Sequence, residues 1–204
     1  MSTFVLVHGS WHGAWCWHRV TPLLEQLGHA VLTPDLPGHG GDLTPVGALS
    51  LRAYADRLGV TIDAAGEGVV LVGHSLGGMV ISQAAEDRQG QVRALVYVAG
   101  LLPGDGQSLA DLTQGDDESL LTPNCVPSDD GATLSVRDGS LREALYADCP
   151  DEDLALARRL MRPEPLAPLL QPVRLTAAGA GAGRMPRFLW SAFRIAPCPS
   201  PDSG

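Results

Sequence analysis

The chain has 204 residues, of which 45% are hydrophobic and 18% are charged, a composition that predicts one globular domain with a substantial core. Lysine is absent, and 14 arginines face 23 acidic residues, which gives a net charge of −9. That charge argues against binding to nucleic acid or to an anionic membrane surface. The lack of lysine excludes Schiff-base chemistry and a lysine general base.

The sequence contains no stretch of about 18 apolar residues, and no basic segment precedes an apolar run at its start. We therefore expect no membrane span and no secretion signal. The four cysteines form no CxxC pair and match neither a disulfide scaffold nor a zinc site. These features predict a cytoplasmic protein that binds no membrane, no nucleic acid and no metal.

The first half of the chain alternates two hydrophobic periods. Short apolar runs rich in β-branched residues predict buried strands, and apolar residues at helical spacing predict one-sided helices. We expect strands at residues 3–8, 30–34, 69–73 and 94–98, and helices at residues 20–27, 51–62 and 76–87. Strands that alternate with helices indicate right-handed crossovers and a parallel sheet covered on both faces.

The pattern changes at residues 105–165, where short helical segments (141–147 and 151–161) are separated by turn residues. This stretch holds 14 of the 23 acidic residues and 5 of the 14 arginines, so it carries the whole net charge. We interpret it as a mainly helical cap inserted into a single domain whose core is residues 1–104 and 166–190. Its acidic surface is interpreted as a solvated face, and the alternative is a cap that disfavours anionic substrates.

Gly73-His74-Ser75-Leu76-Gly77 fits the pattern G-x-S-x-G and lies between a predicted strand and a predicted helix. In that context the serine occupies a tight, strained turn and projects its hydroxyl above the sheet. Gly73 and Gly77 avoid collisions of side chains with the neighbouring strand and helix. The pattern predicts that Ser75 is a catalytic nucleophile and that the Leu76 amide, at a helix N-terminus, meets developing negative charge.

His8-Gly9-Ser10 follows the first predicted strand, where a second oxyanion donor is needed. Gly9 lets the backbone approach closely, and the amide of Ser10 is the candidate donor. Together with the serine turn, this loop indicates acyl-transfer chemistry that needs neither a metal nor an organic cofactor.

Residues 4–40, 69–86 and 92–108 resemble the α/β-hydrolase superfamily, most closely the small esterases related to plant methyl esterases and hydroxynitrile lyases. The stretch HGSWHGAWCW is the most specific part of the likeness. The resemblance implies an α/β-hydrolase fold, Ser75 as nucleophile, the amides of Ser10 and Leu76 as oxyanion hole, and a small-molecule ester as substrate. Hydroxynitrile lyases usually carry threonine where this chain has Gly9, so an esterase is favoured over a lyase.

In that family the catalytic order is serine, acid, histidine, and here the order fails. All six histidines lie at position 74 or earlier, so none follows Ser75, and no catalytic acid is found. We therefore predict a carboxylic ester hydrolase by descent whose activity is impaired. The first alternative is an inactive homologue that at most binds a small ester or acid, and the second is a hydroxynitrile lyase-like enzyme.

The end of the chain departs from the family pattern. Residues 185–190 predict a fifth strand, but residues 191–204 form an irregular tail. Back-translated with GC-rich codons and read two bases on, residues 190–204 can spell a family-like segment with the catalytic aspartate. We interpret the tail as an out-of-frame terminus and the fold as truncated at its C-terminal strands. The apolar sheet edge left exposed predicts self-association.

Overall fold

The structure, a computed structural model, describes residues 1–116, 118–176 and 185–190. The irregular tail predicted for residues 191–204 lies outside the described residues. Among the helices that the structure describes, none is both long enough and apolar enough to cross a membrane.

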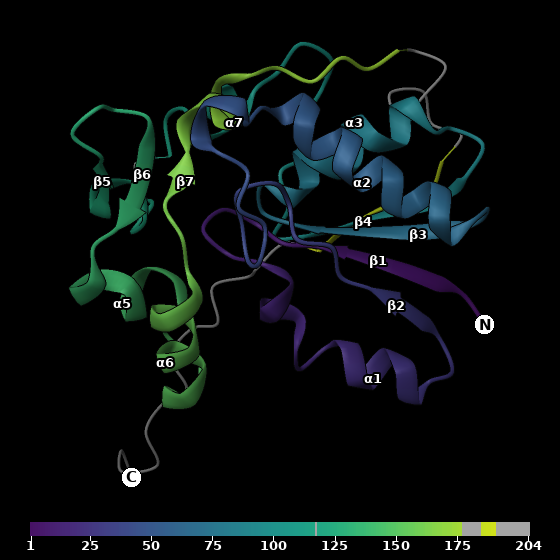
Figure 1. Ribbon diagram of the computed structural model, residues 1–204, viewed down its shortest axis with the longest axis horizontal. Helices are drawn as coiled ribbons and strands as arrows, with labels where there is room; N and C mark the ends of the chain where they lie inside the picture. The colour runs from purple at the N-terminus through teal and green to yellow at the C-terminus, as the bar shows by residue number, and fades with distance from the viewer. Residues whose placement is uncertain (117, 177–184, 191–204) are drawn as a thin grey trace, which may run out of the picture.

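A five-stranded parallel sheet forms the centre of the molecule (Figure 1). The strands lie in the order β2-β1-β3-β4-β8. Their bounds are Thr3–Val7 for β1, Ala30–Leu32 for β2, Val69–His74 for β3, Val92–Val98 for β4 and Arg187–Trp190 for β8. The predicted α/β architecture with its parallel sheet is thus confirmed, and each strand begins and ends within two residues of its expected bounds.

Helices cover both faces of this sheet (Figure 1). The helices α2 (Leu51–Ala65) and α3 (Gly77–Asp87) lie on one face, and α1 (Thr21–Gln26) lies on the other. The α2 helix begins where sequence predicts, because the Ser50 hydroxyl accepts a hydrogen bond from the Ala53 amide at 3.0 Å.

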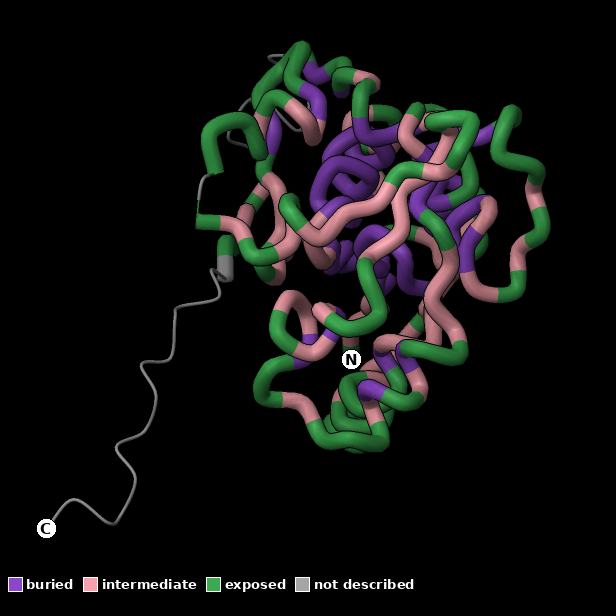
Figure 2. The backbone as a smooth tube through the Cα atoms, turned by 90° about the vertical axis from the view of Figure 1, so that its left-hand side faces the viewer, coloured by how far each residue is buried: buried purple, intermediate pink, exposed green. Residues whose placement is uncertain are grey.

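The hydrophobic core lies mainly between the sheet and the pair α2 and α3. Tyr54, Leu58 and Ile62 on α2 are fully buried with Leu71 of β3. Figure 2 shows most of the buried residues gathered in one part of the molecule, with exposed and half-buried backbone around them. A smaller cluster around Leu6 fills the space on the other face of the sheet.

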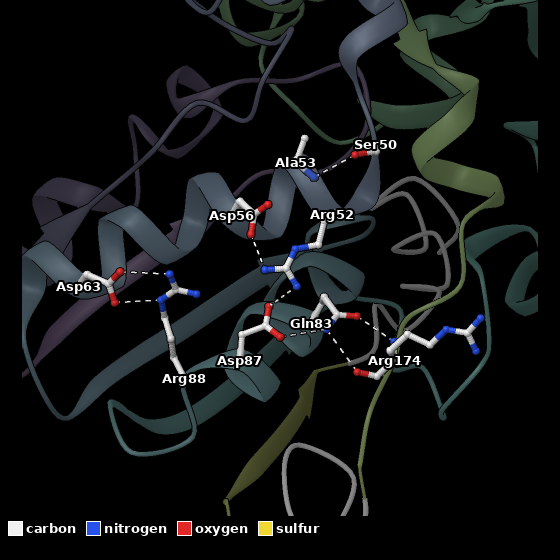
Figure 3. Close-up of polar contacts among 9 residues, drawn as sticks. All are labelled: Ser50, Arg52, Ala53, Asp56, Asp63, Gln83, Asp87, Arg88 and Arg174. Atoms are coloured by element: carbon white, nitrogen blue, oxygen red, sulfur yellow. Dashed lines mark hydrogen bonds and ion pairs between the residues drawn. The ribbon is translucent and has the colours of Figure 1, made fainter.

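Polar contacts join α2 to α3 and to the segment that follows the cap (Figure 3). Arg52 on α2 pairs with Asp56 and, at 2.8 Å, with Asp87 on α3. Such exposed pairs contribute less than about 1 kcal/mol each, so the buried contacts hold the helices together. Gln83 is more firmly placed, since its side chain accepts from the Arg174 amide at 2.8 Å and donates to the Arg174 carbonyl at 3.2 Å.

Residues 105–165, called here the cap segment, contain helices and a small antiparallel sheet of order β5-β6-β7. Its elements are α4 Leu109–Thr113, β5 Cys125–Pro127, β6 Thr133–Val136, α5 Leu141–Leu145, α6 Asp151–Leu160 and β7 Glu164–Pro165, followed by α7 Leu166–Leu170. Short 3-10 helices lie at Ala14–Trp17 and Val46–Ala48 in the core and at Thr122–Asn124 and Asp138–Ser140 in the cap segment. The two predicted helices are present, whereas the three strands were not predicted because two to four residues are too few to show a period of two.

The strand β8 ends the sheet on one side, and nothing within the described residues pairs with its outer edge. Phe188 and Leu189 on β8 are each 58% exposed. Neighbouring strand residues point to opposite faces, so apolar surface is uncovered on both sides of this edge. Unpaired, apolar edges of this kind template pairing with another chain.

We therefore predict that the protein self-associates through β8, and that Leu189→Lys shifts it toward the monomer because an edge lysine opposes pairing. Light scattering coupled to size exclusion over a range of protein concentrations measures this. Leu23→Lys is the matched control, since Leu23 on α1 is 59% exposed and lies away from the edge. A monomer at every concentration of the unsubstituted chain would contradict the prediction.

Candidate active site

Ser75 lies in the turn between β3 and α3, at the carboxyl end of the central strand. Its φ of 51° falls in the left-handed region, which costs a residue with a side chain roughly 1–3 kcal/mol. The turn is fixed from two sides, because the Ser75 carbonyl accepts from the Gly78 amide at 2.9 Å and from the Leu101 amide at 3.2 Å. The predicted strained turn between strand and helix is therefore present, and Ser75 is half-buried within it.

Gly73 and Gly77 allow α3 to fold back onto the sheet. A Cβ on Gly73 would lie 2.6 Å from the backbone of Gly77, and a Cβ on Gly77 would lie 2.6 Å from the carbonyl oxygen of Val7. Backbone atoms cannot move aside as side-chain ends can. Any larger residue at either position would therefore displace the helix that carries the serine turn.

The loop after β1 packs directly on the serine. A Cβ added to Gly9 would lie 2.9 Å from Ser75 Cβ, so the next residue, Ser10, is also held near the turn. Ser10 is 6% exposed and Leu76 is fully buried, and neither of their amides donates a hydrogen bond to any described residue. Buried amides are nearly always paired. Two unpaired amides flanking a serine can therefore bind the oxygen of a ligand.

The N-terminus of α3 adds to this effect. Leu76 is the N-cap residue of the helix, so the partial positive charge of the helix end lies at the same place as its free amide. Negative charge that develops on an oxygen beside Ser75 would be stabilised there.

His8 is fully buried and has a structural position. Its Nδ1–H donates to the Gly9 carbonyl at 2.9 Å, and its Nε2 accepts from the Leu36 amide at 3.1 Å. Both contacts require a neutral ring, and burial lowers the pKa of His8 to about 3. With both ring nitrogens occupied, His8 cannot take a proton from Ser75.

His12 is likewise engaged. Its Nδ1–H donates to the Ser10 carbonyl at 2.6 Å, and its Nε2 meets the Tyr146 hydroxyl at 2.6 Å. Burial lowers the pKa of His12, and the ring stacks on Trp15 with centroids 5.2 Å apart. The ring therefore fastens Ser10 and the cap segment to one another.

His74 precedes the serine at the end of β3. Burial and the neighbouring His12 lower the pKa of His74 to about 4. Over the described ranges, no hydrogen bond joins Ser75 Oγ to a histidine or to a carboxylate. The same ranges contain no group of three residues able to hold a metal ion.

Sequence analysis missed a buried pair of opposite charge. His39 Nε2 lies 2.9 Å from Glu164 Oε2, and both side chains are fully buried. The two residues are 125 positions apart, and neither stands out in its own stretch of sequence. Only a paired change at both positions among homologues would have revealed the contact.

A cleft of about 700 Å³ lies between residues 43–47 and the strands β6 and β7. None of Ser10, Ser75 and Leu76 lines it. It is therefore separate from the surface on which the unpaired amides lie.

Residues 4–200 match the family described as "Alpha/beta hydrolase family". The chain is 35% identical over 175 residues to salicylic acid-binding protein 2 of Nicotiana tabacum, covering 80% of this chain and 67% of that protein. It is 35% identical over 174 residues to methyl jasmonate esterase 1 of Vitis vinifera, covering 80% of this chain and 67% of that protein.

Among solved structures, a variant of tomato methylketone synthase I complexed with beta-ketoheptanoate superposes with a TM-score of 0.83. It is 30% identical, and the match covers 96% of this chain and 80% of that one. Measured against the curated relatives that it matches, the chain spans from about half to two thirds of their length.

We predict that Gly73→Ala lowers the free energy of unfolding by about 1–3 kcal/mol or prevents folding, because overpacked backbone contacts must be relieved by moving α3. Urea denaturation followed by circular dichroism measures the loss. Gly90→Ala is the matched control, since a Cβ on Gly90 meets nothing within 4 Å. Equal stability of the two variants would show that α3 does not need the close approach at Gly73.

Proposed function

Because the chain belongs to the alpha/beta hydrolase family, we propose that it is a carboxylic ester hydrolase by descent, with Ser75 as its nucleophile. The observation that carries the proposal is the strained serine at φ 51° beside the unpaired amides of Ser10 and Leu76. A turn conformation that costs free energy persists where surrounding contacts enforce it, and such sites cluster at catalytic centres.

In the proposed reaction, Ser75 Oγ attacks the ester carbonyl carbon, and the carbonyl π electrons move to the oxygen. The amides of Ser10 and Leu76 donate hydrogen bonds to that oxyanion, an effect worth about 10²–10³ in rate per donor. The serine proton passes to a base and then to the leaving alcohol as the acyl–oxygen bond breaks. Water repeats the sequence on the acyl-serine and releases the acid.

No described histidine is placed to act as the general base for Ser75. His8 and His12 have both ring nitrogens engaged, and His39 faces Glu164 and the Pro37 carbonyl. We propose that acylation of Ser75 is consequently slow, since a serine without a general base is a poor nucleophile. An inactive homologue that binds a small ester or acid is the second candidate, favoured by the lack of a histidine after Ser75.

A hydroxynitrile lyase-like activity is disfavoured by the space at Gly9. A Cβ there would lie 2.9 Å from both His74 Nδ1 and Ser75 Cβ, so a threonine could enter only by displacing the serine turn.

For the substrate we propose a small carboxylic ester that carries no charge, in line with a relative named methyl jasmonate esterase 1. The alternative interpretation of the acidic cap segment, as a cap that disfavours anionic substrates, would fit an uncharged ester. We also propose that the protein needs no cofactor and works in the reducing cytoplasm.

We predict that p-nitrophenyl acetate slowly acetylates Ser75, and that Ser75→Ala abolishes the protein-dependent release of p-nitrophenol because the proposed nucleophile is removed. Mass spectrometry of the peptide that contains residue 75, together with the rate of p-nitrophenol release, measures both steps. Ser140→Ala in the cap segment is the control and should match the unsubstituted chain.

Unchanged release by Ser75→Ala, with no acetyl on Ser75 in the unsubstituted chain, would refute the nucleophile. Fast turnover that Ser75→Ala removes would instead show that an upstream histidine serves as base, which would refute the impairment.

A further inference from the structure

Trp11 is the residue directly after the proposed oxyanion donor, and its backbone is strained. Its φ of 64° lies in the left-handed region, which a bulky residue adopts only when its surroundings enforce it. We call residues 8–13 the oxyanion loop. The contacts of Trp11 show what fixes the shape of this loop.

Every polar group of Trp11 is held by the cap segment. Its carbonyl accepts from the Arg162 amide at 3.0 Å, and its indole Nε1–H donates to the Leu134 carbonyl at 2.8 Å. Its amide donates to Glu164 Oε2 at 2.9 Å. Two of these partners are backbone groups, so Glu164 is the only side chain among them.

Glu164 joins the oxyanion loop to a second core loop. The same Oε2 accepts from His39 Nε2–H at 2.9 Å, and His39 Nδ1–H donates to the Pro37 carbonyl at 3.1 Å. The Pro37 carbonyl requires a proton on Nδ1, and opposite an ionised Glu164 the Nε2 atom carries one too, so that the pair is an imidazolium and a carboxylate. The second carboxylate oxygen, Oε1, is buried and has no partner among the described residues. Burial acts to lower the pKa of His39, but the hydrogen bond and charge of Glu164 outweigh it and raise that pKa.

A buried ion pair is a costly way to attach a cap, since desolvation offsets most of the attraction and an apolar pair of similar volume does as well. The carboxylate provides something that an apolar side chain cannot. It accepts from two N–H groups on two different loops, and one of them belongs to the peptide that follows Ser10.

Ser10 is thereby fixed from its carboxyl side. Its carbonyl accepts from His12 Nδ1–H at 2.6 Å, and the next amide is bound to Glu164. The Ser10 amide itself belongs to the preceding peptide plane, whose Gly9 carbonyl accepts from His8 Nδ1–H at 2.9 Å and from the His12 amide at 3.4 Å. The bond from Trp11 to Glu164 fixes the other side of Ser10, so both peptide planes that meet at Ser10 are held while its amide has no partner among the described residues.

We propose that Glu164, with His39 as its counter-charge, is a positioning residue that holds the Ser10 amide in place for the oxyanion. The kinetic part of this inference rests on the proposed function. The structural part, that Glu164 determines the conformation of the oxyanion loop, does not.

Three variants test the proposal. The double variant His39→Leu with Glu164→Leu removes both charges, so it leaves no uncompensated buried charge, but the Trp11 amide loses its acceptor. Glu164→Gln is the conservative rescue, because its carbonyl oxygen in the place of Oε2 still accepts from the Trp11 amide and from a neutral His39 that carries its proton on Nε2. Gln83→Leu is the matched control, since it removes the hydrogen bonds of a buried side chain to the Arg174 backbone, and none of these bonds involves the oxyanion loop (Figure 3).

Two readouts are measured on each variant: hydrogen exchange of the Trp11 amide by NMR, and the rate of Ser75 acetylation by p-nitrophenyl acetate. In the double variant we expect Trp11 exchange to rise at least about tenfold, as a lost buried hydrogen bond of 1.4 kcal/mol would give. The maximal acetylation rate should fall by roughly 10²-fold, with the half-saturating ester concentration nearly unchanged. Glu164→Gln should restore both quantities, and Gln83→Leu should alter neither while lowering the melting temperature.

Unchanged Trp11 exchange in the double variant overturns the proposal. So does faster exchange with an undiminished acetylation rate, or an equal loss of that rate in Gln83→Leu. If the unsubstituted chain shows no acetylation of Ser75, the proposed function fails and the exchange result alone decides whether Glu164 holds the loop. If the double variant does not fold, Glu164→Asp, which keeps the charge and withdraws the acceptor, gives the same comparison.

Discussion

The close approach of three backbone segments at the carboxyl ends of β1 and β3 is the constraint on which the site depends. The loop after β1, the serine turn and the first turn of α3 come so near to one another that Gly9, Gly73 and Gly77 have no room for a Cβ. This contact brings the loop that contains Ser10 close to the turn that contains Ser75 and Leu76. The parallel pairing of β1 with β3 and the buried contacts of α3 keep these segments together.

The second constraint comes from outside the sheet. The cap segment fixes the oxyanion loop through Trp11, His12 and the buried carboxylate of Glu164. The cap segment therefore also determines the conformation of the oxyanion loop. Most acidic residues of the cap segment are exposed to solvent, whereas the buried Glu164 contacts the oxyanion loop directly.

Most of the fold could be predicted from the sequence, because its strands, turns and helices depend on patterns among neighbouring residues. The run at residues 69–73 followed by G-x-S-x-G predicts a strand, a strained turn and a helix, because each depends on residues next to one another. The link between His39 and Glu164 could not be found in this way, since its two halves are 125 positions apart. The strands β5 to β7 were missed for another reason, because segments so short are defined by their partners and not by their own composition.

The contacts of Trp11 also bear on the order in which the molecule assembles. Its partners at positions 134, 162 and 164 are among the most distant in the chain, and contacts that close long loops form late in folding. The strands β1 to β4 and the serine itself belong to the first hundred residues, whereas the contacts that hold the strained Trp11 come from the cap segment. A nascent or partly opened chain without a docked cap segment would therefore carry Ser75 without the contacts that hold the oxyanion loop.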